Sequence, residues 1–389
     1  MIASLANPNV LFVFIWTSVL FLYSLRILNV YDELNLLTIA LIMTNVCISL
    51  ILIVLFKARY RRHVLENCLR DFTTINRMKI NRFIKVILAI YVFISILDIC
   101  FSGGVPLYWA LSGDSRQYID FGIPTLHGIA NSILFFSASL LFFLTKVNNK
   151  CKQVKFILWV LFLYQIVILS RGTIIVMVVQ MLGIYLFFYK GSIKKILMML
   201  LFFSGFIIGF GYLGDIRQGG NPYYGFLADE WKGFFDAMPS GSLWGYVYFT
   251  SGLNNLNFNM DIVEPVYFPV YTFAKLIPSV FYSLLGIDKA VDSYTFVEAG
   301  LNVSTIYSAF YSDFGYLAFG LVAVIQLIAS YSYCRARRGS LYALLAYTIA
   351  FQAVFLSFFI DTFFYIPFLF QFFIIFLLKG YLREKRFTI

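Results

Sequence analysis

Residues 35–56 read NLLTIALIMTNVCISLILIVLF, and residues 57–62, which follow at once, read KARYRR. The first stretch carries no charge over the roughly 20 positions that an α-helix needs to cross a bilayer. The basic stretch after it is typical of the cytoplasmic end of such a helix, since Lys and Arg are retained on that side. The two stretches together predict a membrane-spanning helix with its C-terminal end inside.

The same pattern recurs along the whole chain. Hydrophobic residues make up 61% of the sequence and charged residues 13%, against roughly 45–50% and 25% in soluble domains. The composition predicts an all-α, polytopic integral membrane protein, with residues 1–389 forming a single membrane domain of about ten transmembrane helices. Nine further apolar runs lie near 9–25, 84–101, 125–145, 156–170, 172–189, 196–213, 314–333, 341–360 and 362–379.

Charge distribution orients these predicted helices. If they alternate, 23 of the 30 Lys and Arg residues fall on one side together with both termini. The positive-inside rule makes that side cytoplasmic. Because the basic charge is explained by topology, nucleic-acid binding is excluded and the lipid bilayer is the expected partner. The seven outer cations are Arg26, Arg116, Arg171, Arg217, Lys232, Lys275 and Lys289.

Signatures of soluble enzymes are missing from the chain. It contains no phosphate-binding GxxxxGK[ST], no GxSxG, no HExxH and no DxD pair, and its five cysteines form no CxxC pair. We therefore expect neither a metal nor a cofactor. His127, near the outer end of the fourth predicted helix, is expected to serve helix packing. Asp98 and Asp361 also lie near outer helix ends, and Asp98 is expected to pair with an outer arginine.

Residues 214–313 form one large outer loop. The loop opens with GDIRQGGNPYYGF (214–226). It ends at Asp313, within the closing motif NVSTIYSAFYSDFG (302–315). Apolar residues at Leu227, Trp231, Phe234, Phe235 and Met238 predict a helix lying along the membrane interface. The pieces 243–254 and 265–287 are expected to re-enter or lie on the membrane. If they crossed it as an extra pair, the count would rise to twelve.

Two outer arginines lie beside apolar helix ends, at the expected depth of lipid headgroups. Arg171 belongs to the tight turn LSRGT (169–173), and Arg217 lies at the start of the large loop. A guanidinium in such a position can hold a phosphate bidentately. The alternatives are that Arg171 extends to the interface and that Arg217 pairs with Asp215.

The sequence closing the loop resembles a known family. Asn302, Thr305, Tyr307 and the Asp313-Phe314-Gly315 triplet, followed by Gly320, are similar to a segment that leads into a late helix of Wzy-type O-antigen polymerases, the oligosaccharide repeat unit polymerases. SRG at 170–172 and an Arg followed by Gly at 217–220 are also similar to that family. Related O-antigen ligases carry a histidine in the large outer loop, and this loop has none.

The resemblance implies a GT-C-like membrane glycosyltransferase of the bacterial inner membrane, multi-pass, with both termini cytoplasmic and a periplasmic active face. Its activity would be inverting, metal-independent polymerisation of undecaprenyl-diphosphate-linked glycans, with a chain-length regulator protein in the same membrane as partner. The alternatives are an O-antigen ligase, a transporter of a lipid-linked or anionic solute, or a scaffold.

Candidate site residues follow from that chemistry. Arg217 first and Arg171 second would stabilise the departing diphosphate. Asp313, Glu298 or Asp215 would deprotonate the acceptor hydroxyl, although Asp313 could equally cap the eighth helix. Side chains expected to contact sugars are Tyr223, Tyr224, Tyr248, Tyr307 and Tyr311, with Trp231 and Trp244, and Asn254, Asn302 and Thr305.

Overall fold

The computed structural model describes residues 5–56, 75–147, 152–189, 219–239, 241–278, 294–298 and 300–382, with isolated residues at 205, 208–209, 211–212, 214–215, 281–282 and 284. In these residues the secondary structure is helical, apart from one isolated antiparallel bridge between Leu28 and Leu227. Four helical stretches, 36–55, 77–112, 126–147 and 308–337, are long and apolar enough to cross a membrane, and four further apolar helices are shorter. The architecture is that expected of a helical membrane protein.

Helices occupy nine of the ten predicted apolar runs, and the remaining run, 196–213, lies mostly outside the described residues. In the described residues before 190, the helices are α2 (Pro8–Ser24), α3 (Leu36–Leu55), α5 (Arg77–Ser102), α6 (Pro106–Ser112), α7 (Leu126–Val147), α8 (Lys152–Val167) and α9 (Arg171–Phe187). Residues 219–314, called the outer segment below, contain α11 (Asp229–Asp236), α12 (Gly241–Ile262), α13 (Val270–Ala274) and α15 (Ser308–Phe314). The chain ends with α16 (Ala318–Arg337), α17 (Leu341–Phe355) and α18 (Ile366–Leu382). Single turns of 3₁₀ helix are η1 (Tyr118–Asp120), η2 (Tyr224–Phe226) and η3 (Gly315–Leu317).

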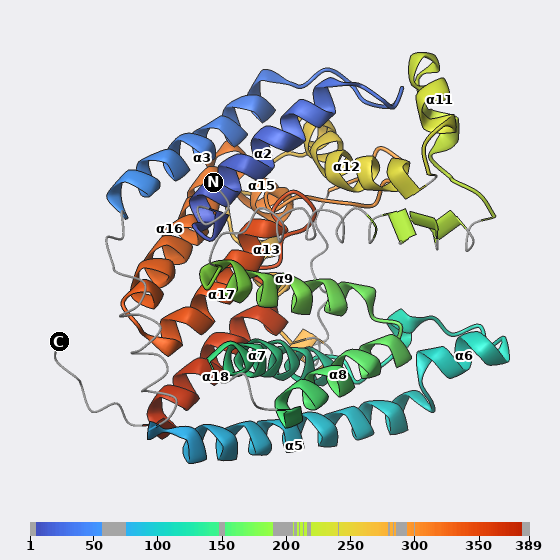
Figure 1. Ribbon diagram of the computed structural model, residues 1–389. Coiled ribbons are helices and arrows are strands. Elements are labelled where there is room, and N and C mark those ends of the chain that lie inside the picture. The colour runs from blue at the N-terminus through green and yellow to red at the C-terminus, as the bar shows by residue number, and fades with distance from the viewer. Residues whose placement is uncertain are drawn as a thin grey trace.

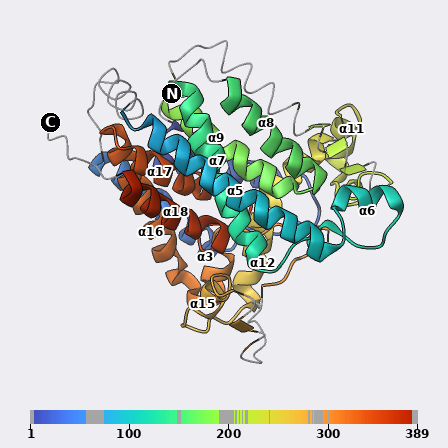
Figure 2. The same cartoon turned by 90° about the horizontal axis from the view of Figure 1, so that it is seen from below.

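The helices pack around one continuous apolar core. In Figure 1, α2, α3 and α16 cover one side of α17, while α5, α7, α8 and α18 form the other side, with α9 between them. Figure 2 views the bundle from the side of α5, with α18 next to it. Trp16, Phe136, Tyr347 and Phe351 are among the largest side chains that are fully buried in this core.

Helix ends separate to two sides of the bundle. The ends of α3, α16 and α18 and the starts of α5 and α17 lie on the left of Figure 1, whereas α6 and α11 lie on the right. Each helix end in the left-hand group adjoins a basic stretch of the sequence. The alternation of the helices across a bilayer stays a prediction.

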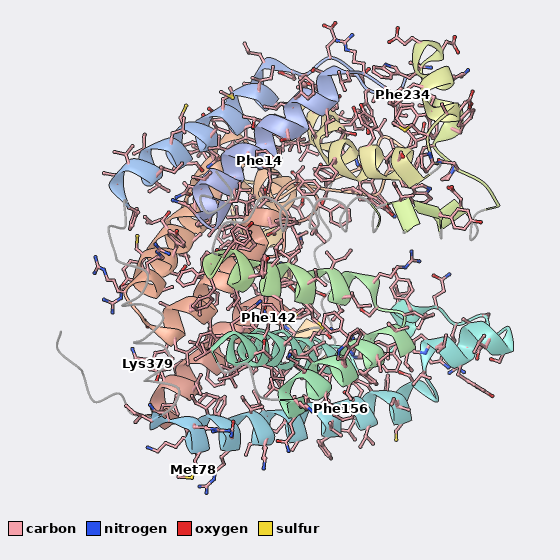
Figure 3. The ribbon with its side chains drawn as sticks, in the orientation of Figure 1. Phe14, Met78, Phe142, Phe156, Phe234 and Lys379 are labelled. Atoms are coloured by element: carbon pink, nitrogen blue, oxygen red, sulfur yellow. The ribbon has the colours of Figure 1, made fainter. Side chains whose placement is uncertain are left out.

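Large apolar side chains point away from the bundle. Phe14 on α2, Met78 on α5 and Phe156 on α8 are 54%, 87% and 69% exposed, and Figure 3 shows them on the outer surface. Burying such area is favourable by roughly 25 cal/mol per Å², so an apolar surface of this extent needs a covering. Acyl chains would supply it.

Buried amides join helices across the core. Gln180 of α9 donates to Gln352 of α17 at 3.3 Å and to Gln371 of α18 at 3.2 Å, and accepts from Ser139 of α7 at 2.9 Å. Hydrogen bonds of this kind hold transmembrane helices together where the hydrophobic effect between helices is weak. They fix α9 between the two sides of the bundle.

Candidate functional site

The outer segment is built on α12, a 22-residue helix buried on most of its sides. It packs against α2 and α3. A Cβ on Gly252 would lie 2.5 Å from the Ser304 carbonyl oxygen and 2.6 Å from that of Phe358. Glycine at this position therefore lets two other segments of backbone approach the helix closely. The predicted piece 243–254 falls within this helix.

One side of α12 holds the connection between α2 and α3. The Asn254 amide oxygen accepts from the Tyr23 hydroxyl at 2.8 Å, and its nitrogen donates to the Val30 carbonyl at 3.3 Å. Asn257 accepts from the Asn35 backbone N–H at 2.7 Å and donates to the Glu33 carbonyl at 2.9 Å. Asn254, expected to bind a sugar hydroxyl, is thus engaged within the fold.

The opposite side of α12 holds residues 294–303. The nitrogen of Asn255 donates to the carbonyls of Leu301 at 2.5 Å and Val303 at 2.7 Å, and its oxygen accepts from the Val297 backbone at 3.0 Å. Asn259 both donates to Thr295 at 2.6 Å and accepts from it at 2.8 Å. Side-chain amides here satisfy backbone groups as a neighbouring strand would.

An aromatic cluster lies at the start of α12. Trp244 donates from its indole to the Asp215 carboxylate at 2.6 Å, and its ring lies 4.8 Å from the Tyr223 ring and 5.8 Å from the Tyr248 ring. A Cβ on Gly214 would lie 2.6 Å from the Trp244 ring. Tyr223, Trp244, Tyr248 and Asp215 are called the aromatic cluster below.

The aromatic cluster adjoins the loop that carries two other predicted site residues. The Tyr223 hydroxyl donates to the Gly300 carbonyl at 3.1 Å, and burial raises the pKa of this phenol, which keeps it a donor. Glu298 and Asn302 lie two residues on either side of Gly300. Asn302 is exposed and Glu298 is half-buried, and the Glu298 carboxylate makes no hydrogen bond or ion pair within the described residues.

Other predicted site residues are used by the fold. Asp313 is fully buried and accepts from the backbone N–H groups of Tyr271 and Thr272, each at 2.8 Å. It therefore caps α13 and not the helix that follows it in sequence.

The remaining residues of the closing motif are also engaged. The buried Thr305 hydroxyl accepts from the Tyr307 backbone at 3.2 Å. The Tyr307 hydroxyl donates to the Asn45 amide oxygen at 3.0 Å, and that of Tyr311 to the Met260 carbonyl at 3.1 Å. These side chains anchor the end of the outer segment to α3 and α12.

A helix is present at the predicted place, as α11; its position along a membrane interface stays a prediction. Trp231 and Phe235 pack against the core, whereas Phe234 is 49% exposed and lies at the edge of the molecule in Figure 3. Tyr224 is exposed, and its hydroxyl donates to the Asp236 carboxylate, which raises the pKa of the phenol. Its ring is available at the surface.

Most outer cations are paired with carboxylates. The pairs are Arg26 with Glu33 at 2.8 Å, Arg116 with Asp114 at 2.6 Å, Lys232 with Asp229 at 2.7 Å and Lys275 with Asp361 at 3.9 Å. Arg217 and Lys289 lie outside the described residues. Arg171 is the first residue of α9 and its side chain is exposed. Its turn is fixed by Leu169 at φ 54° and by a 2.6 Å bond between the hydroxyls of Ser170 and Thr173.

Asp98 of α5 and His127 of α7, for which the sequence predicted other roles, are in contact. Asp98 is 1% exposed, and its carboxylate lies 2.8 Å from His127 Nδ1. The expectation that Asp98 pairs with an arginine was therefore wrong. The acid lies in the last turns of one long apolar run and the histidine at the start of the following one, and this placement was the signal in the sequence.

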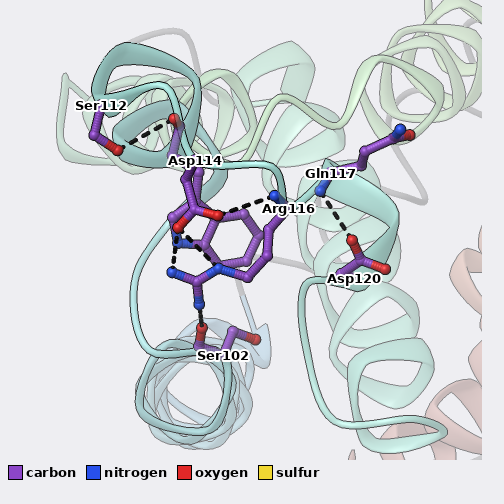
Figure 4. Close-up of polar contacts among 7 residues, drawn as sticks. Ser102, Ser112, Asp114, Arg116, Gln117 and Asp120 are labelled. Atoms are coloured by element: carbon purple, nitrogen blue, oxygen red, sulfur yellow. Dashed lines mark hydrogen bonds and ion pairs between the residues drawn. The ribbon is translucent and has the colours of Figure 1, made fainter.

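The link between α5 and α7 has a separate exposed side, shown in Figure 4. Arg116 donates to the Asp114 carboxylate and, at 2.6 Å, to the Ser102 carbonyl. Its guanidinium lies 4.5 Å from the centre of the Trp109 ring. The Asp120 carboxylate accepts from the Gln117 backbone at 2.9 Å. Arg116 is thus occupied in closing the link.

No protein-family model matches the chain, and no curated protein and no solved structure matches it either. In the part of the chain that the structure describes, no group of three or more His, Cys, Asp or Glu side chains could hold a metal ion. Assignment of a function therefore depends on the residues themselves.

Proposed function

We propose that the protein is a glycosyltransferase that polymerises undecaprenyl-diphosphate-linked oligosaccharide repeat units into O-antigen or a related surface polysaccharide. We place it in the bacterial inner membrane, with both termini cytoplasmic and the outer segment facing the periplasm. The observation that carries the proposal is the aromatic cluster with its neighbours Glu298 and Asn302, because the buried rings of Tyr223 and Trp244 hold the half-buried Tyr248 on the outer segment.

The proposed transfer balances without a metal. The acceptor hydroxyl oxygen forms a bond to the anomeric carbon of the donor glycan, and the bond from that carbon to the lipid diphosphate breaks with inversion. The diphosphate leaves with the electron pair, so no acid is required. A guanidinium stabilises the charge that develops on it, and Arg217, two residues after Asp215, is the first candidate.

The acceptor proton requires a base near the bond that forms. Asp313 is used by two backbone N–H groups and Asp215 by the indole of Trp244. Of the three carboxylates expected from the sequence, Glu298 is the one without such a bond in the described residues. Tyr248 and Asn302 are the groups we propose for contact with the sugars. Trp244 is buried and supports the Tyr248 ring.

The test is the lipopolysaccharide ladder of a deletion strain complemented with wild type or with Arg217→Ala at equal membrane level. Arg116→Ala is the matched control, since Arg116 is also an outer arginine but is bound to Asp114 and Ser102. We expect wild type and the control to restore the ladder, and Arg217→Ala to give core with a single repeat.

Other outcomes separate the alternatives. If deletion leaves lipid-linked polymer that is not transferred to lipopolysaccharide, the protein is a ligase. A ladder that survives the deletion unchanged rules out a glycan-assembling role and favours the transporter.

A further inference from the structure

The Asp98 and His127 pair has the geometry of an oriented base. Asp98 Oδ2 lies 2.8 Å from His127 Nδ1, and Asp98 Oδ1 accepts from the Ile123 backbone N–H at 2.9 Å. The carboxylate therefore holds the proton of the imidazole on Nδ1 and leaves Nε2 as the acceptor. Nε2 makes no hydrogen bond to any described residue, and the His127 side chain is 27% exposed.

The surrounding backbone fixes the ring in place. The Gly122 N–H donates to the Ser102 hydroxyl at 2.8 Å. A Cβ on Gly122 would lie 2.8 Å from the His127 ring, and the Phe121 ring meets the imidazole edge-on at 5.6 Å. A side chain that only filled space would not need this set of bonds. Nothing comparable orients the Glu298 carboxylate.

The pair lies at the same corner of the bundle as Arg171. Phe121, which contacts His127, packs with Trp109 and Ile168 in a small apolar cluster separate from the main core. Ile168 precedes Arg171 by three residues in the turn between α8 and α9. This small apolar cluster thus connects His127 to the turn that carries the exposed Arg171.

We infer that His127 Nε2 is the base that deprotonates the acceptor hydroxyl, with Asp98 as its positioning residue and Arg171 as the cation that holds a lipid diphosphate next to it. The inference rests on the proposed function. The hydroxyl proton moves to Nε2 as the oxygen attacks the anomeric carbon, and the imidazolium then returns this proton to water. Imidazole suits this task because Nε2 keeps a lone pair that can accept the proton while Nδ1–H is bound to Asp98.

Few other charged groups face the imidazole from the elements packed around it. Asp98 on α5 is the nearest, and the hydroxyls of Tyr91 and Tyr164 lie close enough to Asp98 to interact with its charge. In the link, Arg116 and Asp114 are paired with each other. The start of α18 contributes Ile366 and Pro367 beside Gly128.

The test is polymerisation of a lipid-linked repeat unit by purified full-length protein in detergent, measured from pH 5 to 9. His127→Asn is the decisive variant, because its amide can occupy the place of Nδ1 and keep the bond to Asp98 while offering no base. His127→Ala with and without added imidazole is the second variant. Asp120→Asn, which removes a carboxylate from the same link, is the control.

We expect His127→Asn to melt at the wild-type temperature but to lose activity by roughly 10²-fold or more, as is typical for loss of a general base. His127→Ala should regain activity with imidazole, and Asp98→Asn should displace the pH profile. The inference is overturned if His127→Asn keeps the wild-type rate and profile, or if Glu298→Gln alone abolishes the low-pH limb. If wild type forms no polymer from any lipid-linked unit, it is the proposed function that fails.

Discussion

The link between α5 and α7 (103–125) and the outer segment (219–314) are each bound by one buried aspartate, Asp98 and Asp313. The two carboxylates have different partners. Asp313 accepts from two backbone N–H groups of α13. One carboxylate oxygen of Asp98 accepts from a backbone N–H, and the other is hydrogen-bonded to the ring of His127. A carboxylate bound only to backbone can anchor a segment, whereas one bound to a titratable ring can also influence a proton. Substitutions in the outer segment should therefore mainly lower the stability of the protein. Substitutions of Asp98 or His127 beside the link should mainly lower the rate of the proposed reaction.

The largest effect is expected at Asp313. Asp313→Ala would leave the N–H groups of Tyr271 and Thr272 without their acceptor and a cavity beside α13, at a cost of about 4 kcal/mol of unfolding free energy. We expect a loss of the monodisperse peak in fluorescence-detected size-exclusion chromatography. Asp229→Ala on the exposed face of α11 is the control, and equal yields for both variants would contradict the contrast between the regions.

Asn255 should come next. Asn255→Ala removes three hydrogen bonds that hold residues 294–303 and leaves three backbone groups without a partner. We expect the unfolding free energy to fall by roughly 3 kcal/mol. The expected result is a lower melting temperature and faster proteolysis within 294–303. The exposed Asn302→Ala should leave both measurements unchanged, and similar cleavage of the two variants would show that α12 does not hold this loop.

Asp361, which lies between α17 and α18 beside Lys275 of the outer segment, makes the stability of the protein depend on pH. Burial, only partly offset by Lys275, raises the pKa of Asp361 to about 6. The native protein thus binds this proton more tightly than the unfolded chain, so the stabilisation is full below about pH 4 and is lost as pH rises through 6. Asp361→Asn should add about 3 kcal/mol of unfolding free energy at pH 8 and flatten the melting temperature between pH 4 and 6. A pH dependence unchanged in this variant would assign the titration to another group.

The smallest effect is expected in the link. Arg116 pairs with Asp114 and lies over Trp109, but it does so at the exposed side, where solvent screens such contacts. Arg116→Ala should change the melting temperature by an amount close to the error of the measurement. If it destabilised the protein as much as Asp313→Ala, the link would be an anchor as well.

Hydropathy predicted the positions of the helices because a run of apolar residues has few alternatives to a buried or membrane helix. It could not predict the uses of Asn254, Asp313 or Tyr307, whose partners are 224–231, 41–42 and 262 residues away in sequence. Polar residues on an outer loop looked like ligand contacts because nothing in the sequence indicates a buried α12. Asp98 and His127 were within reach of sequence reasoning, since they lie at the outer ends of two apolar runs that follow one another in the chain.

The contacts of Gly252 and Ser357 also determine when the protein can finish folding during synthesis. Ser357 accepts from the indole of Trp16 at 3.0 Å, and its carbonyl accepts from the Ile306 backbone at 2.7 Å. The Phe358 carbonyl lies against Gly252 of α12. The contacts that α2, α12 and the end of the outer segment make here can therefore form only after Ser357 and Phe358 have been synthesised. These residues follow Trp16 by more than 300 positions. Until α17 has been inserted, the nascent chain must hold the asparagine-rich α12 without its final neighbours, and chains stalled before residue 357 should be the ones that quality-control proteases remove.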